Sequence, residues 1–494
     1  MLIGGEMVEG AGAPVIVVNP ATEEEIATVP SATPAQVDQA VRSSKDAFKT
    51  WRNMPAPERG ELLHELSSWI TANAESLAVT LTREGGKPLV ENADEMGWSA
   101  SCFDFYAELG RLERGRVVPS GEEGQLNLVV KEPYGAITAI VPWNYPILLL
   151  AWKLAPALAA GNTVVVKPSP YTPLSTLELC AGFADIFPPG VVNVVTGEAA
   201  TGASLVEHPD ISMVAFTGSV DTGKAIMRSA AEQLKKLHLE LGGKDAFIVC
   251  DDVDLEVAAK GAVWSAYLNT GQVCTSAERF YVMSEIYTDF VDAMVAETEK
   301  LVVGDPMKDE TDVGPMVRGI QRDKVESQLE AARSSGAKVL TGGDRGSFDS
   351  GYFLMPAVVV DVDDSMDLFN RETFGPVAPI AQVGSLDEAI ERTNASEYGL
   401  GANVYTQRMD RILKAMEEID AGTIWFNDPL TDNEAAPFGG MKASGGAREL
   451  GPEGLEEFRQ AKHIHIDAKM DVKSWWYPYK DYVRYQAEHG TAPG

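Results

Sequence analysis

Cys274 is the residue whose surroundings best suit nucleophilic chemistry. It stands in residues 269–275, after a predicted helix and a glycine, where a turn can expose the thiol and direct main-chain N–H groups at a reacting atom. The thiolate is the better nucleophile, and it needs a cationic, basic or helix-terminal neighbour. Taken alone, a cysteine is more often a small core residue, which is the simpler interpretation for Cys102, Cys180 and Cys250.

Glu240 and Asn144 could assist such a nucleophile. Glu240 stands between two leucines just before a Gly-Gly turn, and an apolar pocket would raise its pKa towards that of a general base. Asn144 lies between a predicted strand and a predicted helix, where a neutral amide can stabilise an oxyanion without taking part in proton transfer. Taken alone, each residue fits a structural place in a turn equally well.

A glycine-containing turn and a lysine could bind a nucleotide. Residues 218–223 open a helix after a strand; they are not G-x-G-x-x-G, but their glycines and the helix N-terminus could receive a pyrophosphate. Lys167 ends a predicted strand, where it could hold ribose hydroxyls or a phosphate. A plain strand-to-helix turn and a solvated lysine are the alternatives.

The elements that position these residues alternate between strands and helices. A capped amphipathic helix is predicted over 33–51. In a first block, strands are predicted at 136–141, 163–167, 191–195 and 213–216, and helices at 147–160, 173–187, 200–207 and 222–235. In a second block, from about 244 to 427, the predicted strands include 246–250, 280–283, 357–362 and 423–426, and the helices include 255–268 and 286–301. This alternation favours parallel sheets with helices on their faces and ligands at the carboxyl ends of the strands.

Composition narrows the function classes further. The chain has 494 residues, enough for two or three domains, and a net charge of −32 that disfavours nucleic acid and anionic membrane as partners. Its four cysteines form no C-x-x-C pair, so no metal site and no disulfide framework is expected, and the predicted location is the cytoplasm. The apolar residues 136–160 contain three prolines and a lysine, which argues against a membrane span.

Together these motifs resemble the aldehyde dehydrogenase superfamily over about residues 19–466. Seven motifs follow the family's order: Pro142-Trp143-Asn144, Lys167-Pro168, Gly218-Ser219, Glu240-Leu241-Gly242-Gly243, Gly271-Gln272-Val273-Cys274, Glu372-Thr373-Phe374-Gly375-Pro376 and Pro437-Phe438-Gly439-Gly440. The resemblance implies an α/β fold of three parts and a tail: a Rossmann-like NAD(P)-binding domain (1–116 and 133–240), an α/β catalytic domain (241–427), a small β oligomerisation domain (117–132 and 456–468) and an aromatic extension (469–494).

The resemblance also implies a role for each site residue. Cys274 would be the nucleophile, Asn144 and the N–H of Cys274 the oxyanion hole, and Glu240 the base that activates water to hydrolyse a thioester. The positions that match the family's cofactor site are Trp143, Lys167, Ser169, Gly218, Ser219, Gly223, Leu241, Glu372 and Phe374. Lys153 and Glu449 match a proton relay, although a structural ion pair explains them as well. Ala447 replaces a family glycine beside Glu449, which weakens that assignment.

Cofactor and substrate are less constrained. Pro170 replaces a family acidic residue that repels the extra phosphate of NADP, so NAD+ is favoured and NADP+ is not excluded; no metal is expected. The positions that match the family's substrate tunnel are Tyr145, Leu149, Trp152, Val273, Thr275, Asp432 and Phe438. Two of these aromatics match the betaine-aldehyde branch, and residues 271–282 are closer to lactaldehyde dehydrogenases. Hydroxy-, amino-, aliphatic and aromatic aldehydes all stay open, as does a general hydrophobic tunnel.

Two alternatives and one extension complete these expectations. A CoA-acylating dehydrogenase is disfavoured by Glu240, and a non-catalytic protein on this fold by the presence of thiol, carboxylate and amide together. Residues 475–485 contain six aromatics, which would be costly to expose. We expect them to pack on the body of their own subunit or of a neighbour, near a tunnel mouth. The family also implies a homodimer or homotetramer joined by edge strands.

Overall fold

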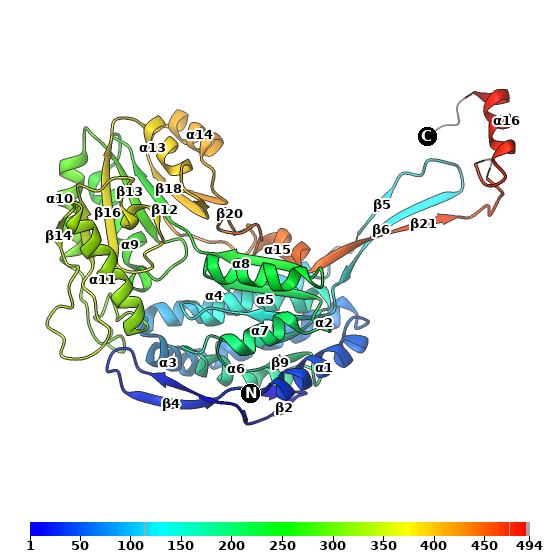
Figure 1. Ribbon diagram of the computed structural model, residues 1–494, viewed down its shortest axis with the longest axis horizontal. Helices are drawn as coiled ribbons and strands as arrows, with labels where there is room; N and C mark the ends of the chain where they lie inside the picture. The colour runs from blue at the N-terminus through cyan, green and yellow to red at the C-terminus, as the bar shows by residue number, and fades with distance from the viewer. Residues whose placement is uncertain (113–114, 474, 491–494) are drawn as a thin grey trace.

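Two seven-stranded sheets carry the body of the computed structural model, which describes residues 1–112, 115–473 and 475–490 (Figure 1). The first sheet has the order β11-β10-β7-β8-β9-β1-β2. Its strands are β1 (Leu2–Ile3), β2 (Glu6–Met7), β7 (Ala136–Ile140), β8 (Thr163–Lys167), β9 (Val192–Val194), β10 (Met213–Gly218) and β11 (Lys236–Leu241). Strands β7 to β11 are mutually parallel, and β1 and β2 add an antiparallel edge.

Eight helices precede or interleave with these strands. They are α1 (Pro34–Trp51), α2 (Ala56–Ala72), α3 (Ala74–Gly85), α4 (Leu89–Leu109), α5 (Pro146–Ala160), α6 (Leu174–Ile186), α7 (Ala199–Glu207) and α8 (Val220–Ala231). Helix α1 begins with the predicted cap, because Thr33 and Gln36 form a reciprocal capping box. Helix α5 is buried along almost its whole length, which explains why its sequence is apolar on every face.

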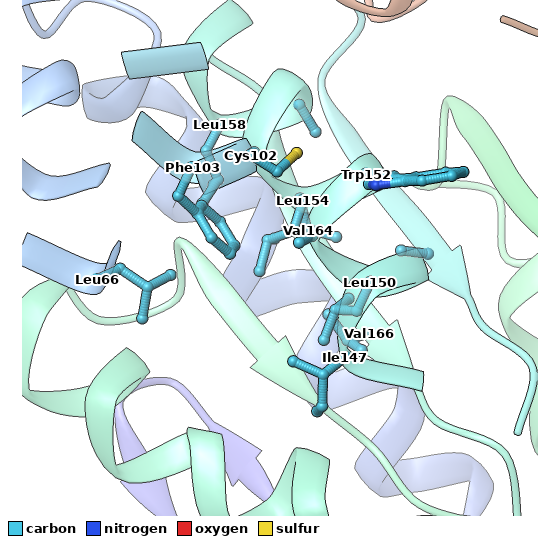
Figure 2. Packing of buried hydrophobic residues seen from close by; sticks show 14 of the residues in the cluster. Leu66, Cys102, Phe103, Ile147, Leu150, Trp152, Leu154, Leu158, Val164 and Val166 are labelled. Atoms are coloured by element: carbon cyan, nitrogen blue, oxygen red, sulfur yellow. The ribbon is translucent and has the colours of Figure 1, made fainter. Parts of the chain in front are cut away.

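The packing of α5 fixes the geometry of the site that follows. Leu150, Leu154 and Leu158 of α5 lie among buried side chains of α4 and β8 (Figure 2). Cys102 and Phe103 of α4 belong to the same cluster, so Cys102 is a core residue. A helix held on several sides in this way gives the residues at its N-terminal end and on its inner face fixed positions.

The second sheet has the order β14-β15-β16-β13-β12-β18-β19, parallel except for β14. Its strands are β12 (Asp245–Val249), β13 (Ala277–Met283), β14 (Lys338–Thr341), β15 (Ala357–Val360), β16 (Val377–Val383), β18 (Gly401–Tyr405) and β19 (Thr423–Phe426). The accompanying helices are α9 (Leu255–Tyr267), the 3-10 turn η1 (Leu268–Gly271), α10 (Tyr287–Thr298), α11 (Gly319–Ser334), α12 (Asp367–Asn370), α13 (Leu386–Asn394) and α14 (Met409–Glu418). Two separate clusters of buried apolar residues pack against this sheet.

A third sheet extends away from the body (Figure 1). It contains β5 (Gly115–Val118), β6 (Gln125–Pro133) and β21 (Arg459–Asp467), all antiparallel, with β6 in the centre. Helix α15 (Gly451–Glu457) precedes it, and α16 (Tyr479–His489) follows β21 at its far end. The remaining strands form two small pairs, β3 (Pro14–Val18) with β4 (Glu25–Pro30) and β17 (Tyr398–Gly399) with β20 (Met441–Lys442). In the described part of the chain, no helix is both long and apolar enough to cross a membrane.

The prediction for residues 232–235 was wrong. The expected helix 222–235 ends at Ala231, and residues 236–241, for which no element was predicted, form β11. Three leucines alternate with Lys236, His238 and Glu240 along this strand, a period of two that indicates a strand. Glu240 therefore lies on a rigid element, paired with Thr217 of β10.

The aromatic tail does not pack on the body of its own subunit, which corrects that part of the expectation. Strand β21 carries it away, since nine extended residues span about 30 Å. Helix α16 consequently lies beyond the tip of the third sheet (Figure 1). Trp476 and Tyr477 remain 53% and 81% exposed, and the ring of Tyr477 packs only against Tyr479 of the same tail among the described rings, with centroids 4.5 Å apart.

Candidate active site

Cys274 stands in a turn directly before β13, with its side chain partly exposed. The N–H of Ser276 donates to the carbonyl of Val273 at 3.0 Å and closes the turn. Among the described residues, none accepts a hydrogen bond from the main-chain N–H of Cys274. Burial raises the pKa of the Cys274 thiol well above its ordinary value, and the nearby carboxylate of Glu240 adds to that shift.

The backbone just before this turn is strained. Asn269 and Thr270 have φ values of 49° and 60°, in the left-handed region that side chains other than glycine rarely adopt. Glu91 holds Asn269 by accepting its N–H at 3.0 Å, and the Thr270 hydroxyl donates to the Gly314 carbonyl at 3.0 Å. Hydrogen bonds from the surroundings thus hold the nucleophile turn in place.

Asn144 reaches the same turn from the other sheet. It lies buried in the loop between β7 and α5, and its Nδ2 donates to the carbonyl of Gln272 at 3.0 Å. A second hydrogen bond runs in the opposite direction, from Nδ2 of Asn269 to the carbonyl of Asn144 at 3.2 Å. Because one of the two Nδ2 hydrogens is used in this way, the other can serve an oxyanion beside Cys274.

Glu240 is buried near Cys274, and neither carboxylate oxygen has a hydrogen-bond partner among the described residues. Burial raises its pKa well above the ordinary value, and the negative charge of Glu449 adds to this effect. The chain after it stays close to the nucleophile, since a Cβ on Gly243 would lie 2.6 Å from the carbonyl oxygen of Cys274. An unpartnered carboxyl of raised pKa is what a general base for water requires.

Lys153 and Glu449 form a fully buried ion pair behind Glu240. His238, which sequence reasoning missed, joins them with 3.1 Å between its Nε2 and Glu449 Oε1. Burial alone would raise the pKa of Glu449, but Lys153 and His238 hold it below its usual value. Ala447 does not disturb this arrangement, because the main chain of Glu449 pairs with Phe438 through two hydrogen bonds of 2.7 Å. His238 and Glu240 occupy alternate positions on β11, a spacing that could have identified the histidine.

Two cavities meet at Cys274. One, of about 420 Å³, is lined by α4, α5 and residues 428–438; the other, of about 160 Å³, lies towards β10, β11 and α11. Asn144, Leu149 and Cys274 line both of them. Cys274 therefore borders two neighbouring cavities.

The smaller cavity contains six of the nine residues expected at the cofactor: Trp143, Gly218, Ser219, Leu241, Glu372 and Phe374. Gln321 and Lys324 of α11 also line it, and nothing in their sequence context indicated this. Phe374 meets Trp143 edge to face, with ring centroids 5.4 Å apart. A Cβ on Gly242 would lie 2.2 Å from a Glu372 carboxylate oxygen, so glycine is needed there.

The other three expected cofactor residues lie outside this cavity. Lys167 is buried at the end of β8, donates to the carbonyl of Pro168 at 2.8 Å, and has its pKa lowered to about 8 by burial. Ser169 closes a local turn by accepting the N–H of Tyr171 at 3.2 Å. Gly223 allows α8 to approach Leu241, whose side chain would be 2.7 Å from an added Cβ.

The residues in and beside the smaller cavity suit the separate parts of NAD(P)+. Ser219 caps α8, whose N-terminus faces the smaller cavity and suits a pyrophosphate. The Glu372 carboxylate suits ribose hydroxyls, and burial raises its pKa to about 7. The Trp143 and Phe374 rings form an apolar wall of the kind that a flat aromatic ring contacts. The residues present therefore fit a nicotinamide dinucleotide.

Glu278 holds the loop whose residues Glu372 and Phe374 line the smaller cavity. Its carboxylate accepts the main-chain N–H groups of Thr373 and Phe374, each at 2.7 Å, and pairs with Lys244. The two residues that follow Glu372 are thereby fixed to β13. Sequence reasoning assigned no role to Glu278, because these two main-chain partners are about a hundred residues away.

The larger cavity contains all seven residues expected in the substrate tunnel: Tyr145, Leu149, Trp152, Val273, Thr275, Asp432 and Phe438. Trp152 and Phe438 pack together with ring centroids 5.1 Å apart. Helix α4 adds four residues that sequence reasoning missed: Glu91, Asp94, Glu95 and Trp98. Their spacing of i, i+3, i+4 and i+7 places them on one helix face and could have revealed them.

Comparisons with known proteins agree with this arrangement. A family model described as the aldehyde dehydrogenase family matches residues 7–464. Retinaldehyde dehydrogenase 3 of Rattus norvegicus is 40% identical over 463 residues, covering 92% of this chain and 90% of that protein. A chloroplastic aminoaldehyde dehydrogenase of Arabidopsis thaliana is 38% identical over 474 residues, covering 93% and 94%. A betaine aldehyde dehydrogenase of Staphylococcus aureus, solved in complex with NAD+, has a TM-score of 0.94 at 34% identity, covering 96% of each chain.

Proposed function

The chain belongs to the aldehyde dehydrogenase family and is an NAD(P)+-dependent aldehyde dehydrogenase, and we propose that it makes the carboxylic acid through a thioester on Cys274. The observation that carries the proposal is that Cys274 lines both cavities. The larger one would take the aldehyde and the smaller one the nicotinamide cofactor.

In the first half of the reaction, Sγ of Cys274 adds to the carbonyl carbon and the carbonyl oxygen becomes an oxyanion. Asn144 Nδ2 and the free N–H of Cys274 donate to that oxyanion, which stabilises the charge where it develops. Bound NAD(P)+ supplies the hydride acceptor that oxidises this adduct to a thioester. Glu372, Phe374 and the N-terminus of α8 would hold the cofactor.

In the second half, Glu240 accepts a proton from water, and the resulting hydroxide attacks the thioester carbon. The C–S bond breaks, the acid leaves, and Cys274 returns as the thiolate or thiol. Glu240 suits this role because its oxygens are unpartnered and its pKa is raised. The proton would then pass from Glu240 towards Lys153, Glu449 and His238.

NAD+ is the proposed preference over NADP+. The carboxylate of Glu198 interacts electrostatically with Lys167 at the end of β8, and it would repel a 2′-phosphate bound there. Glu198 thus supplies the negative charge that Pro170 lacks. A comparison of kcat/KM for the two cofactors, in the wild type and in Glu198→Gln, tests this: the variant should gain relative activity with NADP+.

Association into a homodimer or homotetramer is also proposed. The third sheet projects from the body with β5 and β21 as open edges, and such edges pair readily with another chain. The exposed aromatics of the tail would then contact the neighbouring subunit.

The central test is a set of variants assayed by NADH formation with and without CoA. Cys274→Ala should abolish turnover, whereas Cys180→Ala, a buried thiol outside both cavities, should retain it. Glu240→Gln should give one equivalent of NADH and then slow release of the acid. If Glu240→Gln still turns over when CoA is present, the enzyme transfers the acyl group to CoA and does not hydrolyse the thioester. If Cys274→Ala still turns over, the reaction does not pass through a thioester on Cys274.

A further inference from the structure

The larger cavity is rich in carboxyl groups. Five of its twenty described lining residues are acidic, namely Glu91, Asp94, Glu95, Asp428 and Asp432, and none of the twenty is lysine, arginine or histidine. Glu95 is neutralised, because it pairs with Lys87 behind the cavity wall. The other four form no salt bridge within the described part of the chain.

Two of these carboxylates, Asp94 and Asp428, are exposed, whereas the other two are partly buried. Glu91 and Asp432 are half-buried, and burial raises the pKa of Glu91 to about 8 and that of Asp432 to about 7. Burying a carboxylate without a partner costs free energy that a solvated surface carboxylate does not cost. The hydrogen bond that Glu91 accepts from Asn269 explains its burial in part, but no described residue donates a hydrogen bond to the carboxylate of Asp432.

Aromatic rings form the rest of the wall. Trp98, Tyr145, Trp152, Trp264 and Phe438 line the cavity, with Trp98 and Trp264 about half exposed at 40% and 51%. One face of Tyr145 already contacts a cation, since Lys87 Nζ lies 3.6 Å from the ring centroid. Ring faces and carboxylates together attract a positive charge, and they offer no partner for a negative one.

We propose that the substrate is an aldehyde that carries a positively charged amino or quaternary ammonium group a few bonds from its carbonyl. The inference rests on the proposed function, since the carbonyl must reach Cys274. The cation lies among the carboxylates of Asp94, Asp428 and Asp432 and against the indole rings. The positive charge of the substrate takes the place that a lysine or arginine would have beside these carboxylates, and it favours their ionised forms.

Binding can be measured without catalysis, which separates this inference from the proposed function. Cys274→Ala is titrated with choline and with its neutral isostere 3,3-dimethylbutan-1-ol in a calorimeter. The cationic alcohol should bind about tenfold more tightly, a difference of about 1.4 kcal/mol, because ring faces and carboxylates attract a cation and not its neutral isostere. Equal affinities would overturn the inference.

Turnover is then compared across matched aldehydes. The panel is (trimethylammonio)acetaldehyde, 3-aminopropanal, the neutral isostere 3,3-dimethylbutanal and anionic succinic semialdehyde. Both cations should exceed the neutral aldehyde in kcat/KM by about tenfold, and the anion should be poorest. A higher kcat/KM for the quaternary cation would indicate that the aromatic rings recognise the charge. A higher kcat/KM for the primary amine would indicate that the carboxylates recognise it.

Variants locate the charge that matters. Asp432→Asn and Asp94→Asn should each lower the cation-to-neutral ratio of kcat/KM about tenfold. Glu434→Gln, on the same segment as Asp432 but outside the cavity, should leave that ratio unchanged. Oxidation of the neutral aldehyde at least as well as of the cations would reject this substrate class and leave the dehydrogenase intact. No oxidation of any aldehyde, with choline still preferred in binding, would reject the proposed function alone.

Discussion

Glu278 and Lys244 form a buried ion pair, with 2.6 Å between Oε2 and Nζ, beneath the loop that carries Glu372 and Phe374. Lys244 also donates to the hydroxyl of Thr373 at 2.9 Å. Burial lowers the pKa of Lys244, but the charge of Glu278 opposes that shift. The shape of the cofactor cavity therefore depends on two residues that do not line it.

Replacing Glu278 by glutamine should destabilise the protein by about 3 kcal/mol, since a buried lysine would lose its counter-charge. The KM for NAD+ should rise as the loop of Glu372 loosens. Chemical denaturation and initial-rate kinetics measure the two effects. The matched control is Glu256→Gln, which breaks an exposed pair with Lys260 and should leave the free energy of unfolding almost unchanged, because solvent screens exposed charges. Similar losses in both variants would contradict the assignment.

Replacing Asn144 by alanine should lower kcat by about 10²- to 10³-fold, the usual cost of removing one oxyanion donor. The size of the NADH burst should fall with it if the first half of the reaction is affected. Asn53→Ala, which removes an exposed helix-end contact to Lys49, serves as the control and should keep full activity. Near-normal kcat in Asn144→Ala would show that the amide is structural.

Asp245 should make stability depend on pH. It is buried, and its pKa is raised from about 3.8 to about 8 by burial. The folded state therefore keeps a proton that the unfolded state loses, so stability falls as pH rises between those values, by up to about 1.4 kcal/mol per pH unit. Asp245→Asn carries no such proton. The free energy of unfolding of the variant, relative to that of the wild type, should therefore increase from pH 5 to pH 8. Parallel plots of the two free energies against pH would contradict this.

His238→Gln tests whether the buried histidine takes part in proton release. Glutamine can keep a contact with Glu449 but cannot carry the proton. If the group acts as a relay, the NADH burst should persist while steady-state turnover falls about tenfold. If His238 only packs against Phe458 (ring centroids 5.3 Å apart), burst and turnover should change together or not at all.

Removal of residues 468–494 should alter assembly, because Trp475, Trp476 and Tyr477 are exposed in the single chain. Light scattering of the truncated and full-length proteins should show a smaller or weaker oligomer after truncation. A Lys469→Gln variant, which removes only a surface contact to Glu123, is the control. Unchanged assembly would mean that the tail does not join subunits.

Local patterns in the sequence predicted much of the fold and the site. Strand β8 was predicted to the residue, since four buried β-formers and a lysine lie between two helices, and Cys274, Asn144 and Glu240 were singled out by their turns. Strand β11 was missed, because its alternation continues a helical run without a turn residue. Glu278 could not be assigned, since its main-chain partners lie in a distant loop, whereas His238 was overlooked together with β11. The tail was misplaced because composition gives the cost of exposure but not the direction in which β21 runs.

The paired main chains of Phe438 and Glu449 have an evolutionary consequence. Both hydrogen bonds, at 2.7 Å each, are made by backbone atoms, so they do not depend on which side chain stands at position 438. Homologues could exchange that ring for a smaller or larger group and admit different molecules, while the carboxylate eleven residues later keeps its depth and orientation. A change of substrate specificity at position 438 therefore need not disturb the position of the Glu449 carboxylate.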